Sequence, residues 1–302
     1  MILMGIGDEG AADLDGQLKL ARELGLDRLE LRSIELPGQL RANLHDISDA
    51  AFDQVVKKLE AAGIRVHCLA STIMNWSRTL EDPFESTLAE VARALPRMQR
   101  LQTKYVRIMS FKPGDSDYRI PREVFRRVRE VTNRFIDAGL QPLHENCTNH
   151  GGMSWQHALE LLDQCPGLKW LYDTGNPISN LDRSKPKPWP MQDPWEFWRN
   201  IREHTTHIHI KDAVWSTARK AADYDWPGEG AARIPAILQD AANRGYSGGI
   251  SIEPHMVKVF HAPDVSLRNV EDQQRNFIDY AQRMEELLNE VRSKTVGPQI
   301  PP

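Results

Sequence analysis

The sequence of 302 residues has little cysteine and no long apolar run. Its three cysteines, Cys68, Cys147 and Cys165, are odd in number and form no C-x-x-C pair, which argues against a disulfide framework and against a zinc ribbon. No stretch approaches the ~20 continuous apolar residues of a membrane span, and the apolar opening at 1–8 is too short for a signal peptide. We therefore expect a cytoplasmic protein in a reducing compartment, with no membrane partner.

The sequence also lacks an excess of positive charge. Its 38 Lys and Arg residues stand against 42 Asp and Glu residues, which gives a formal net charge of -4. A protein that binds nucleic acid usually carries a basic surface for the phosphates, so this balance argues against a nucleic-acid partner. A small neutral or anionic substrate fits better.

Two glycine-rich nucleotide motifs are missing as well, although strands and helices alternate along the chain. The predicted strands are 2–6, 28–32, 65–69, 105–109, 142–145, 169–173, 207–211 and 249–253. The predicted helices are 12–24, 49–61, 86–100, 122–137, 154–163, 194–203, 234–243 and 267–293. This alternation predicts a parallel sheet. Without a G-x-G-x-x-G after the first strand or a P-loop, closure into a barrel is favoured over an open dinucleotide-binding sheet.

The junctions between helices and strands support this interpretation. Gly25, Gly63, Gly139 and Gly245 each follow a predicted helix and directly precede a short apolar strand, as expected of a helix C-cap. The junction at 101–102 has the same spacing without glycine. We predict a single-domain (β/α)8 TIM barrel over residues 1–295 and a disordered C-terminal tail over 296–302.

Polar residues of ligand type end four consecutive predicted strands in the second half. They are Glu145, Asp173, His209 and Glu253. The C-terminal ends of barrel strands meet on one face, so these distant residues are expected to converge. Three carboxylates and one imidazole suit a hard divalent cation, and Mn²⁺ is our first expectation, with Mg²⁺, Co²⁺, Fe²⁺ or Zn²⁺ as options.

Strand alternation sends His207 and His209 to the same side of their strand. His209 is nearer the C-terminal rim and is the predicted ligand, whereas His207 is expected to be a buried interior residue. Lys211 continues the inward face and is a candidate for binding a substrate anion or hydroxyl.

The ordered series H-E-N at 144–146, D-T-G-N at 173–176, H-I-H-I-K-D at 207–212 and I-E-P-H at 252–255 resembles the xylose-isomerase-like TIM barrel superfamily of sugar phosphate isomerases and epimerases. The P-G-E-G turn at 227–230 is similar too, and the likeness spans nearly the whole chain. The resemblance implies that Glu145, Asp173, His209 and Glu253 bind the metal and that one or both of the glutamates exchange protons with the substrate.

The function implied by this resemblance is a metal-dependent isomerase or epimerase of a keto sugar. A cation chelated by a ketone and a neighbouring hydroxyl acidifies the adjacent C–H bond, so that an enediolate forms. Glu145 and Glu253, from nonadjacent strands, would remove and return the proton. His67, at the predicted third strand, is a further candidate acid or base.

The sequence departs from the sugar 3-epimerase pattern at one position. A histidine is usual three residues after the strand-six aspartate, whereas Asn176 stands here. Asn176 is therefore a candidate substrate-binding residue, together with Arg32, His144 and Lys211, and with Trp215 in a tryptophan-rich loop. His255 is expected on the surface.

Three further interpretations stay open. A lyase could use the same acidified C–H bond to cleave a 3-keto glycoside by β-elimination, as in C-glycoside deglycosidases. An abasic-site endonuclease shares the superfamily, but the acidic net charge argues against it. Homo-oligomerisation or a partner subunit would leave no signature in the sequence.

Overall fold

Eight parallel strands form the centre of the computed structural model, which describes residues 1–38, 40–256 and 270–295. Their bounds are β1 Ile2–Gly5, β2 Arg28–Leu31, β5 Arg65–Leu69, β6 Tyr105–Ile108, β7 Gln141–Glu145, β8 Lys169–Asp173, β9 Thr205–Ile210 and β12 Gly249–Ile252. Each one coincides with a predicted strand to within two residues at either end.

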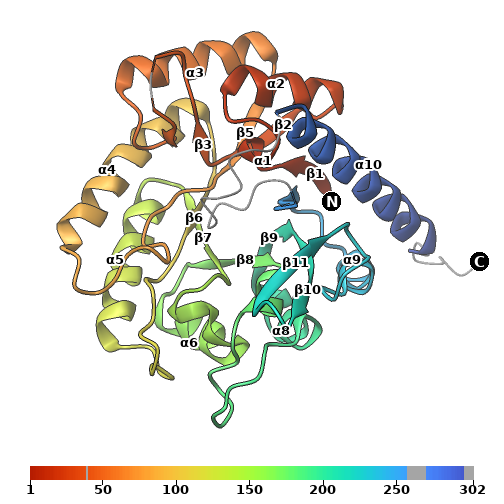
Figure 1. Cartoon of the computed structure of the whole chain (residues 1–302). Coiled ribbons are helices and arrows are strands. Elements are labelled where there is room, and N and C mark those ends of the chain that lie inside the picture. Colours follow the sequence, from red (N-terminus) through yellow and green to blue (C-terminus); the bar gives the residue numbers. More distant parts are fainter. Residues whose placement is uncertain (39, 257–269, 296–302) are drawn as a thin grey trace, which may run out of the picture.

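The strands pair in the order β1-β12-β9-β8-β7-β6-β5-β2, and a single isolated bridge from Ile6 to Glu30 links the two outer strands. The sheet is thus rolled into a nearly closed barrel, as Figure 1 shows. The predicted (β/α)8 fold is confirmed. Because all strands run the same way, their carboxyl ends open on one face of the molecule.

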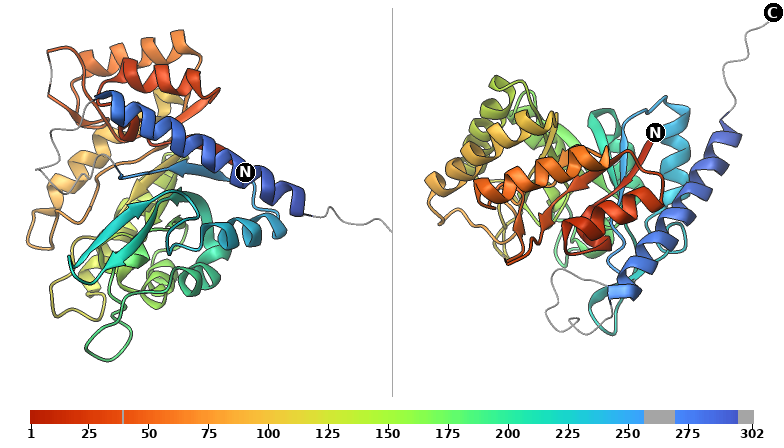
Figure 2. Two further views of the ribbon diagram at one scale, coloured as in Figure 1. Left: turned by 45° about the vertical axis from the view of Figure 1, so that its right-hand side comes forward. Right: turned by 90° about the horizontal axis from the view of Figure 1, so that it is seen from above.

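Helices cover the outside of the barrel in the order that the sequence predicts (Figures 1 and 2). They are α2 Leu14–Glu23, α3 Asp49–Ala62, α4 Phe84–Leu101, α5 Arg122–Asp137, α6 Trp155–Gln164, α8 Pro194–Ile201, α9 Ile234–Asn243 and α10 Val270–Lys294. The long α10 packs against α9 and against the short α1, Gly7–Gly10. No described helix has both the length and the apolar content needed to cross a bilayer.

Left-handed residues end several of these helices, as the glycine pattern predicts. Gly63 caps α3 at φ 67°, and Gly25, Gly139 and Gly245 also have positive φ values. At the junction without glycine, Gln102 takes the same conformation, φ 54°, and caps α4. The chain therefore turns from helix to strand in the same way with or without glycine, and at Gln102 a residue with a Cβ adopts the strained region.

Two apolar regions stabilise the barrel. The larger lies between the sheet and the helices and includes Val55, Val128, Trp170 and Ile208. A small cluster of Cys68, Leu143 and Leu171 fills part of the barrel interior. Apolar side chains therefore fill part of the middle of the barrel, beside the buried polar residues Glu30, His207 and Ser251.

Several short elements were not predicted. They are α1, the pair β3 Ser33–Ile34 and β4 Ala42–Asn43, the 3-10 helices His150–Met153 and Arg202–His204, α7 Asn176–Ser179, and the hairpin of β10 Asp212–Ser216 with β11 Ala221–Asp225. The hairpin stands in what the sequence suggested to be a long loop. The predicted tail at 296–302 lies outside the described residues, as does the predicted start of the last helix at 267.

Candidate active site

The four predicted metal ligands converge at the carboxyl ends of β7, β8, β9 and β12. Glu145, Asp173, His209 and Glu253 each offer one ligand atom, and these atoms all lie within 4.8 Å of one another. Nδ1 of His209 is 3.8 Å from Glu145, 4.0 Å from Asp173 and 3.6 Å from Glu253. Residues 108 positions apart in the sequence thus surround one point in space.

Two fully buried atoms face this point. Among the described residues, Nδ1 of His209 has no hydrogen-bond partner of good geometry, and Oδ2 of Asp173 has only the ammonium of Lys211, at 3.1 Å. A buried polar atom that lacks a partner is costly, and a bound cation would satisfy Nδ1 and use the remaining lone pair of Oδ2. The arrangement therefore fits a divalent ion held by three carboxylates and an imidazole.

Glu30 on β2 sets the orientation of His209. One oxygen of this fully buried carboxylate lies 3.0 Å from Nε2 of His209, 2.9 Å from Nε2 of His207 and 2.7 Å from the hydroxyl of Ser251. Because Nε2 of His209 donates its proton to Glu30, Nδ1 is the ring nitrogen that faces the carboxylates. Both histidines point inward as predicted, and His209 is the one that reaches the acids.

Three cations lie among the acids. Lys211 places its ammonium 3.1 Å from Asp173 and 2.9 Å from Glu253. Arg107 on β6 contacts Glu145 at 3.0 Å, and Arg32, just after β2, contacts Glu253 at 2.6 Å. Each glutamate therefore has its own guanidinium, which fixes the position of the carboxylate and stabilises its charged form.

The charges shift the pKa values of these groups in different directions. Burial alone would raise the pKa of Glu145, but Arg107 and His209 outweigh burial and hold it at about 2. Burial raises the pKa of Asp173 to about 6, although Lys211 opposes that shift. For His209, burial favours the neutral ring, yet Glu30 and Glu145 raise its pKa to about 10. Glu145 is thus ionised at neutral pH, and His209 without a metal is protonated.

Asn176 joins the site through the turn that follows β8. Oδ1 of Asp173 accepts hydrogen bonds from the backbone N–H groups of Gly175 and Asn176, and this turn leads into α7. The amide of Asn176 donates to Oε1 of Glu145 at 3.1 Å. The candidate substrate residues Arg32, Lys211 and Asn176 therefore all contact a predicted metal ligand.

Sequence analysis missed several groups that the structure places here. Asp8 and Glu9 on α1 bind Arg32, at 2.9 Å and 2.5 Å. His255 was expected on the surface but is buried, 3.2 Å from Glu9 and 3.8 Å from Glu253. The ring of Tyr224 on β11 packs against His255 at 5.2 Å. The two acidic residues of α1 were the only hint in the sequence that these groups belong to the site. Nothing in the sequence places α1 or the hairpin over the carboxyl end of the barrel.

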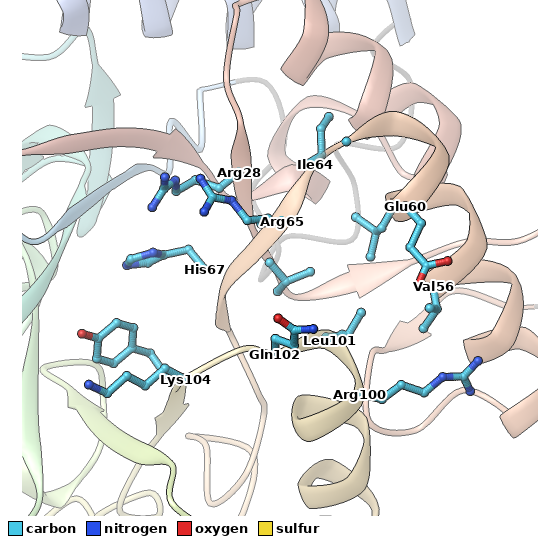
Figure 3. Close-up of a pocket in the computed structure, with 14 residues that line it drawn as sticks. Arg28, Val56, Glu60, Ile64, Arg65, His67, Arg100, Leu101, Gln102 and Lys104 are labelled. Carbon is cyan, nitrogen blue, oxygen red and sulfur yellow. The ribbon is translucent and has the colours of Figure 1, made fainter.

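His67 does not reach this cluster. A bulge in β5 leaves His67 unpaired between the β2–β5 pairs at Leu29 and Glu30, and its ring packs on Tyr105 at 5.2 Å and on His207 at 5.4 Å. Tyr105 begins β6, so His67 lies toward the amino end of the barrel (Figure 3). Its predicted role as acid or base at the metal site does not agree with this position.

His144 does not reach the cluster either. Strand alternation turns it away from Glu145, toward the helices, where it stacks on Trp170 at 4.8 Å and binds the hydroxyl of Ser110 at 2.9 Å. Burial lowers the pKa of His144 to about 3, which keeps the ring neutral. The residue is part of the packing between sheet and helix, a position that does not agree with the predicted substrate-binding role.

The region after β9 is organised around Asp212. Its carboxylate accepts backbone N–H groups from Gly228, Gly230, Ala232 and Ala213, which fixes the P-G-E-G turn beside the strand end. Trp215 pairs with Ala222 within the hairpin and packs on the main core. Its substrate-binding role stays a prediction.

Comparisons with known proteins agree with this geometry. The xylose isomerase-like TIM barrel family model matches residues 18–271. The sequence has no significant match among curated proteins.

Three solved structures illustrate the structural likeness. A D-tagatose 3-epimerase-like protein has a TM-score of 0.72 at 15% identity, covering 98% of this chain and 100% of its own. A xylose isomerase-like protein from Mycobacterium smegmatis, in complex with magnesium, has a TM-score of 0.65 at 16% identity, with coverage of 95% and 97%. The probable 3-DHS dehydratase AsbF from Bacillus anthracis has a TM-score of 0.64 at 16% identity, with coverage of 91% and 98%. At these identities the likeness shows the fold, and the family match over most of the sequence shows that the chain belongs to the xylose isomerase-like TIM barrels.

Proposed function

We propose that the protein is a metal-dependent isomerase or epimerase of a keto sugar or a related polyhydroxy ketone. The single observation that carries this proposal is the meeting of Glu145, Asp173, His209 and Glu253 within 4.8 Å. Family membership supports an enzyme that acts on a sugar-like small molecule. Mn²⁺ is the proposed ion because the donor set is mostly oxygen with one imidazole, and Mg²⁺ would suit the same donors.

A divalent ion at this site would polarise a substrate carbonyl and acidify the neighbouring C–H bond. The residues of the chain then have to move one proton. The pKa of Glu145 is held at about 2, and that of Glu253 lies well below its ordinary value because Lys211, His255 and Arg32 outweigh its burial. Both carboxylates are therefore ionised but weak bases, which explains why the C–H bond must be strongly acidified first.

The two glutamates are well placed to act on opposite sides of a substrate carbon. They come from β7 and β12, which are separated in the sheet by β8 and β9. One carboxylate accepts the proton from carbon and later releases it to solvent. The other takes up a proton from solvent and delivers it to the opposite face, which inverts that centre. Delivery to the adjacent carbon instead gives aldose–ketose isomerisation. Lys211 and Asn176 both contact the carboxylates and are hydrogen-bond donors, so they can orient the oxygens of a substrate bound beside these carboxylates.

The decisive experiment measures solvent deuterium exchange into a panel of free ketoses and aldoses with Mn²⁺-loaded protein. We expect deuterium at one carbon next to the carbonyl. Glu145→Gln and Glu253→Gln should each slow this exchange by about 10²–10⁴-fold, the usual contribution of a general base. Glu60→Gln, on an exposed face of α3, is the matched control and should not change the rate. Wild-type protein that exchanges no substrate proton with any ketone in the panel would contradict the proposal.

A lyase acting on a 3-keto glycoside is the second candidate, and Tyr224 is the observation that favours it. Its half-buried phenol lies close enough to Lys211 and Glu253 for their charges to act on it, and burial raises its pKa. A protonated phenol at the site could donate its proton to a leaving oxygen after the C–H proton is removed. Release of the aglycone from a 3-keto glucoside, lost in Tyr224→Phe while deuterium exchange persists, would favour the lyase.

A further inference from the structure

The amino end of the barrel contains a cavity that the proposed reaction does not use. It has a volume of about 490 Å³ and extends to both sides of the first half of β5 (Figure 3). On the barrel side Arg28, Arg65, His67 and Lys104 lie around one space, whereas Glu60 and Arg100 lie on the other side of the strand. The part nearest the barrel axis is thus lined by basic residues, and Glu60 is the only acid among the lining residues.

The positive charge of this part is not balanced by the described residues. Arg28 binds both oxygens of Asp27 at 2.7 Å, and Arg65 binds the same carboxylate. Two guanidinium groups therefore share one negative charge. Lys104 forms no ion pair within the described chain and lies 5.7 Å from the ring centre of Tyr105. Three cations and one carboxylate leave about two unneutralised positive charges on the barrel side of the cavity.

Neutral polar groups at the inner end of the cavity are also available to a ligand. The His67 imidazole packs on two rings but makes no hydrogen bond to any described residue. Its pKa is lowered to about 4, chiefly by burial, so one ring nitrogen is a donor and the other an acceptor at neutral pH. Arg28 uses Nε and Nη2 on Asp27, and its Nη1 has no partner among the described residues.

We propose that Arg28, Arg65, His67 and Lys104 form a second binding site, specific for a phosphate group. Arginine presents paired N–H donors that match phosphate oxygens, and a phosphate dianion would neutralise the charge that Asp27 leaves unbalanced. The group belongs either to free inorganic phosphate or to a phosphorylated metabolite. The site is separate from the metal centre, since His67 contacts His207 rather than any of the four proposed ligands.

The proposal is tested by titrating the full chain, loaded with diamagnetic Mg²⁺, with inorganic phosphate and, separately, with fructose 6-phosphate. The readouts are calorimetry and the NMR signals of the His67 ring. We expect saturable binding that shifts the His67 signals and that weakens by at least tenfold in Lys104→Ala and in Arg65→Ala. Lys57→Ala removes an exposed charge from the neighbouring helix α3 and should leave binding unchanged.

The two probes identify the source of the phosphate group. Tighter binding of fructose 6-phosphate than of phosphate assigns the site to a phosphorylated metabolite, and the reverse assigns it to the free ion. Binding to the metal centre alone would be lost in Asp173→Asn and would leave the His67 signals unmoved, and that result overturns the proposal. Equal affinity in wild type and Lys104→Ala, or no saturable binding of either probe, overturns it as well.

Discussion

The two ends of the barrel differ in how their charged side chains are paired. At the carboxyl end, Glu145 and Glu253 each have a guanidinium partner, and Lys211 lies between two acids. At the amino end, Arg28 and Arg65 share Asp27, and Lys104 forms no ion pair within the described residues. The acids at the carboxyl end are buried, whereas Arg65 and Lys104 are exposed. A buried charge must be paired to be tolerated, so only the carboxyl end is a rigid, preformed site.

This difference in charge pairing shows how one barrel can hold a cation site at its carboxyl end and an anion site at its amino end. Apolar side chains fill part of the middle of the barrel, and Glu30, His207 and His209 continue along the interior toward the carboxyl end. The carboxyl end attracts a cation to its acids, and the amino end attracts an anion to its guanidinium groups. Experiments that change residues at one end and measure binding at the other therefore test whether the two ends act independently.

The largest expected effect is the pH dependence of metal affinity. The pKa of His209 is raised to about 10 without metal, so a cation must displace a proton from Nδ1 at neutral pH. Affinity for Mn²⁺ should rise about tenfold per pH unit between pH 6 and pH 8, as expected when one proton is released for each ion bound. Calorimetry in buffers of different ionisation enthalpy measures the proton count. An affinity that is flat over this range would contradict the protonated state of His209.

The next effect concerns Glu30, which orients the proposed ligand without contacting the ion. Glu30→Gln should weaken Mn²⁺ binding by about 10–100-fold, the usual cost of losing an outer-shell partner of a metal-binding histidine. His67→Gln changes the amino end and should leave Mn²⁺ affinity unaltered. Glu90→Gln, a buried glutamate paired with Arg78 far from the site, controls for general destabilisation. If His67→Gln weakened Mn²⁺ binding as much as Glu30→Gln, the two ends would not be separate.

A smaller effect is expected from the turn that closes around Asp212. A Cβ at Gly230 would stand 2.2 Å from Oδ1 of Asp212 and 2.8 Å from the backbone nitrogen of Ala213. Gly230→Ala should therefore lower the free energy of unfolding by about 1–3 kcal/mol, the usual cost of overpacking. Gly114→Ala is the control, because its Cβ would meet only the exposed side chain of Asp117 at 3.2 Å. Denaturant unfolding measures both, and equal stabilities would show that the turn is not fixed by Asp212.

An effect that is absent at neutral pH and develops only in acid is expected from the packing around His144. Burial lowers its folded pKa to about 3, below its ordinary value of 6.5, so the unfolded chain binds the extra proton first. The stability from this group is present above pH 6.5 and is lost as pH falls toward 3, with a slope of at most about 1.4 kcal/mol per pH unit. His144→Asn should reduce the measured slope by about one proton. An unchanged slope would show that His144 is already protonated in the fold.

The strands and the four converging ligand residues were accessible from sequence because both depend on local patterns. Apolar strands follow helix caps at regular spacing, and a barrel necessarily brings the carboxyl ends of its strands together. Even the junction at Gln102, where no glycine stands, lies at the same spacing along the sequence as the glycine-capped junctions. Asn176 and Lys211 followed in the same way, since each stands within three residues of a strand end.

The remaining features depend on contacts that the sequence does not specify. His67 was misplaced because Cys68, the residue after it, pairs with the first residue of β6, Tyr105, and the sequence does not show this stagger between neighbouring strands. His255 resembles a surface loop histidine until Glu9 on α1 and Tyr224 on β11 close over it. Arg32 and Arg107 could have paired with any barrel acid, and only the folded chain shows that each one binds a different glutamate.

The central claim is that Glu145, Asp173, His209 and Glu253 hold one divalent ion. Elemental analysis of Mn²⁺-loaded, gel-filtered protein tests it most directly when wild type is compared with His209→Ala and with His255→Asn. We predict one ion per chain in wild type and in His255→Asn, and none in His209→Ala. A wild-type protein that retains no divalent ion, or a His209→Ala variant that keeps its ion, would contradict this account.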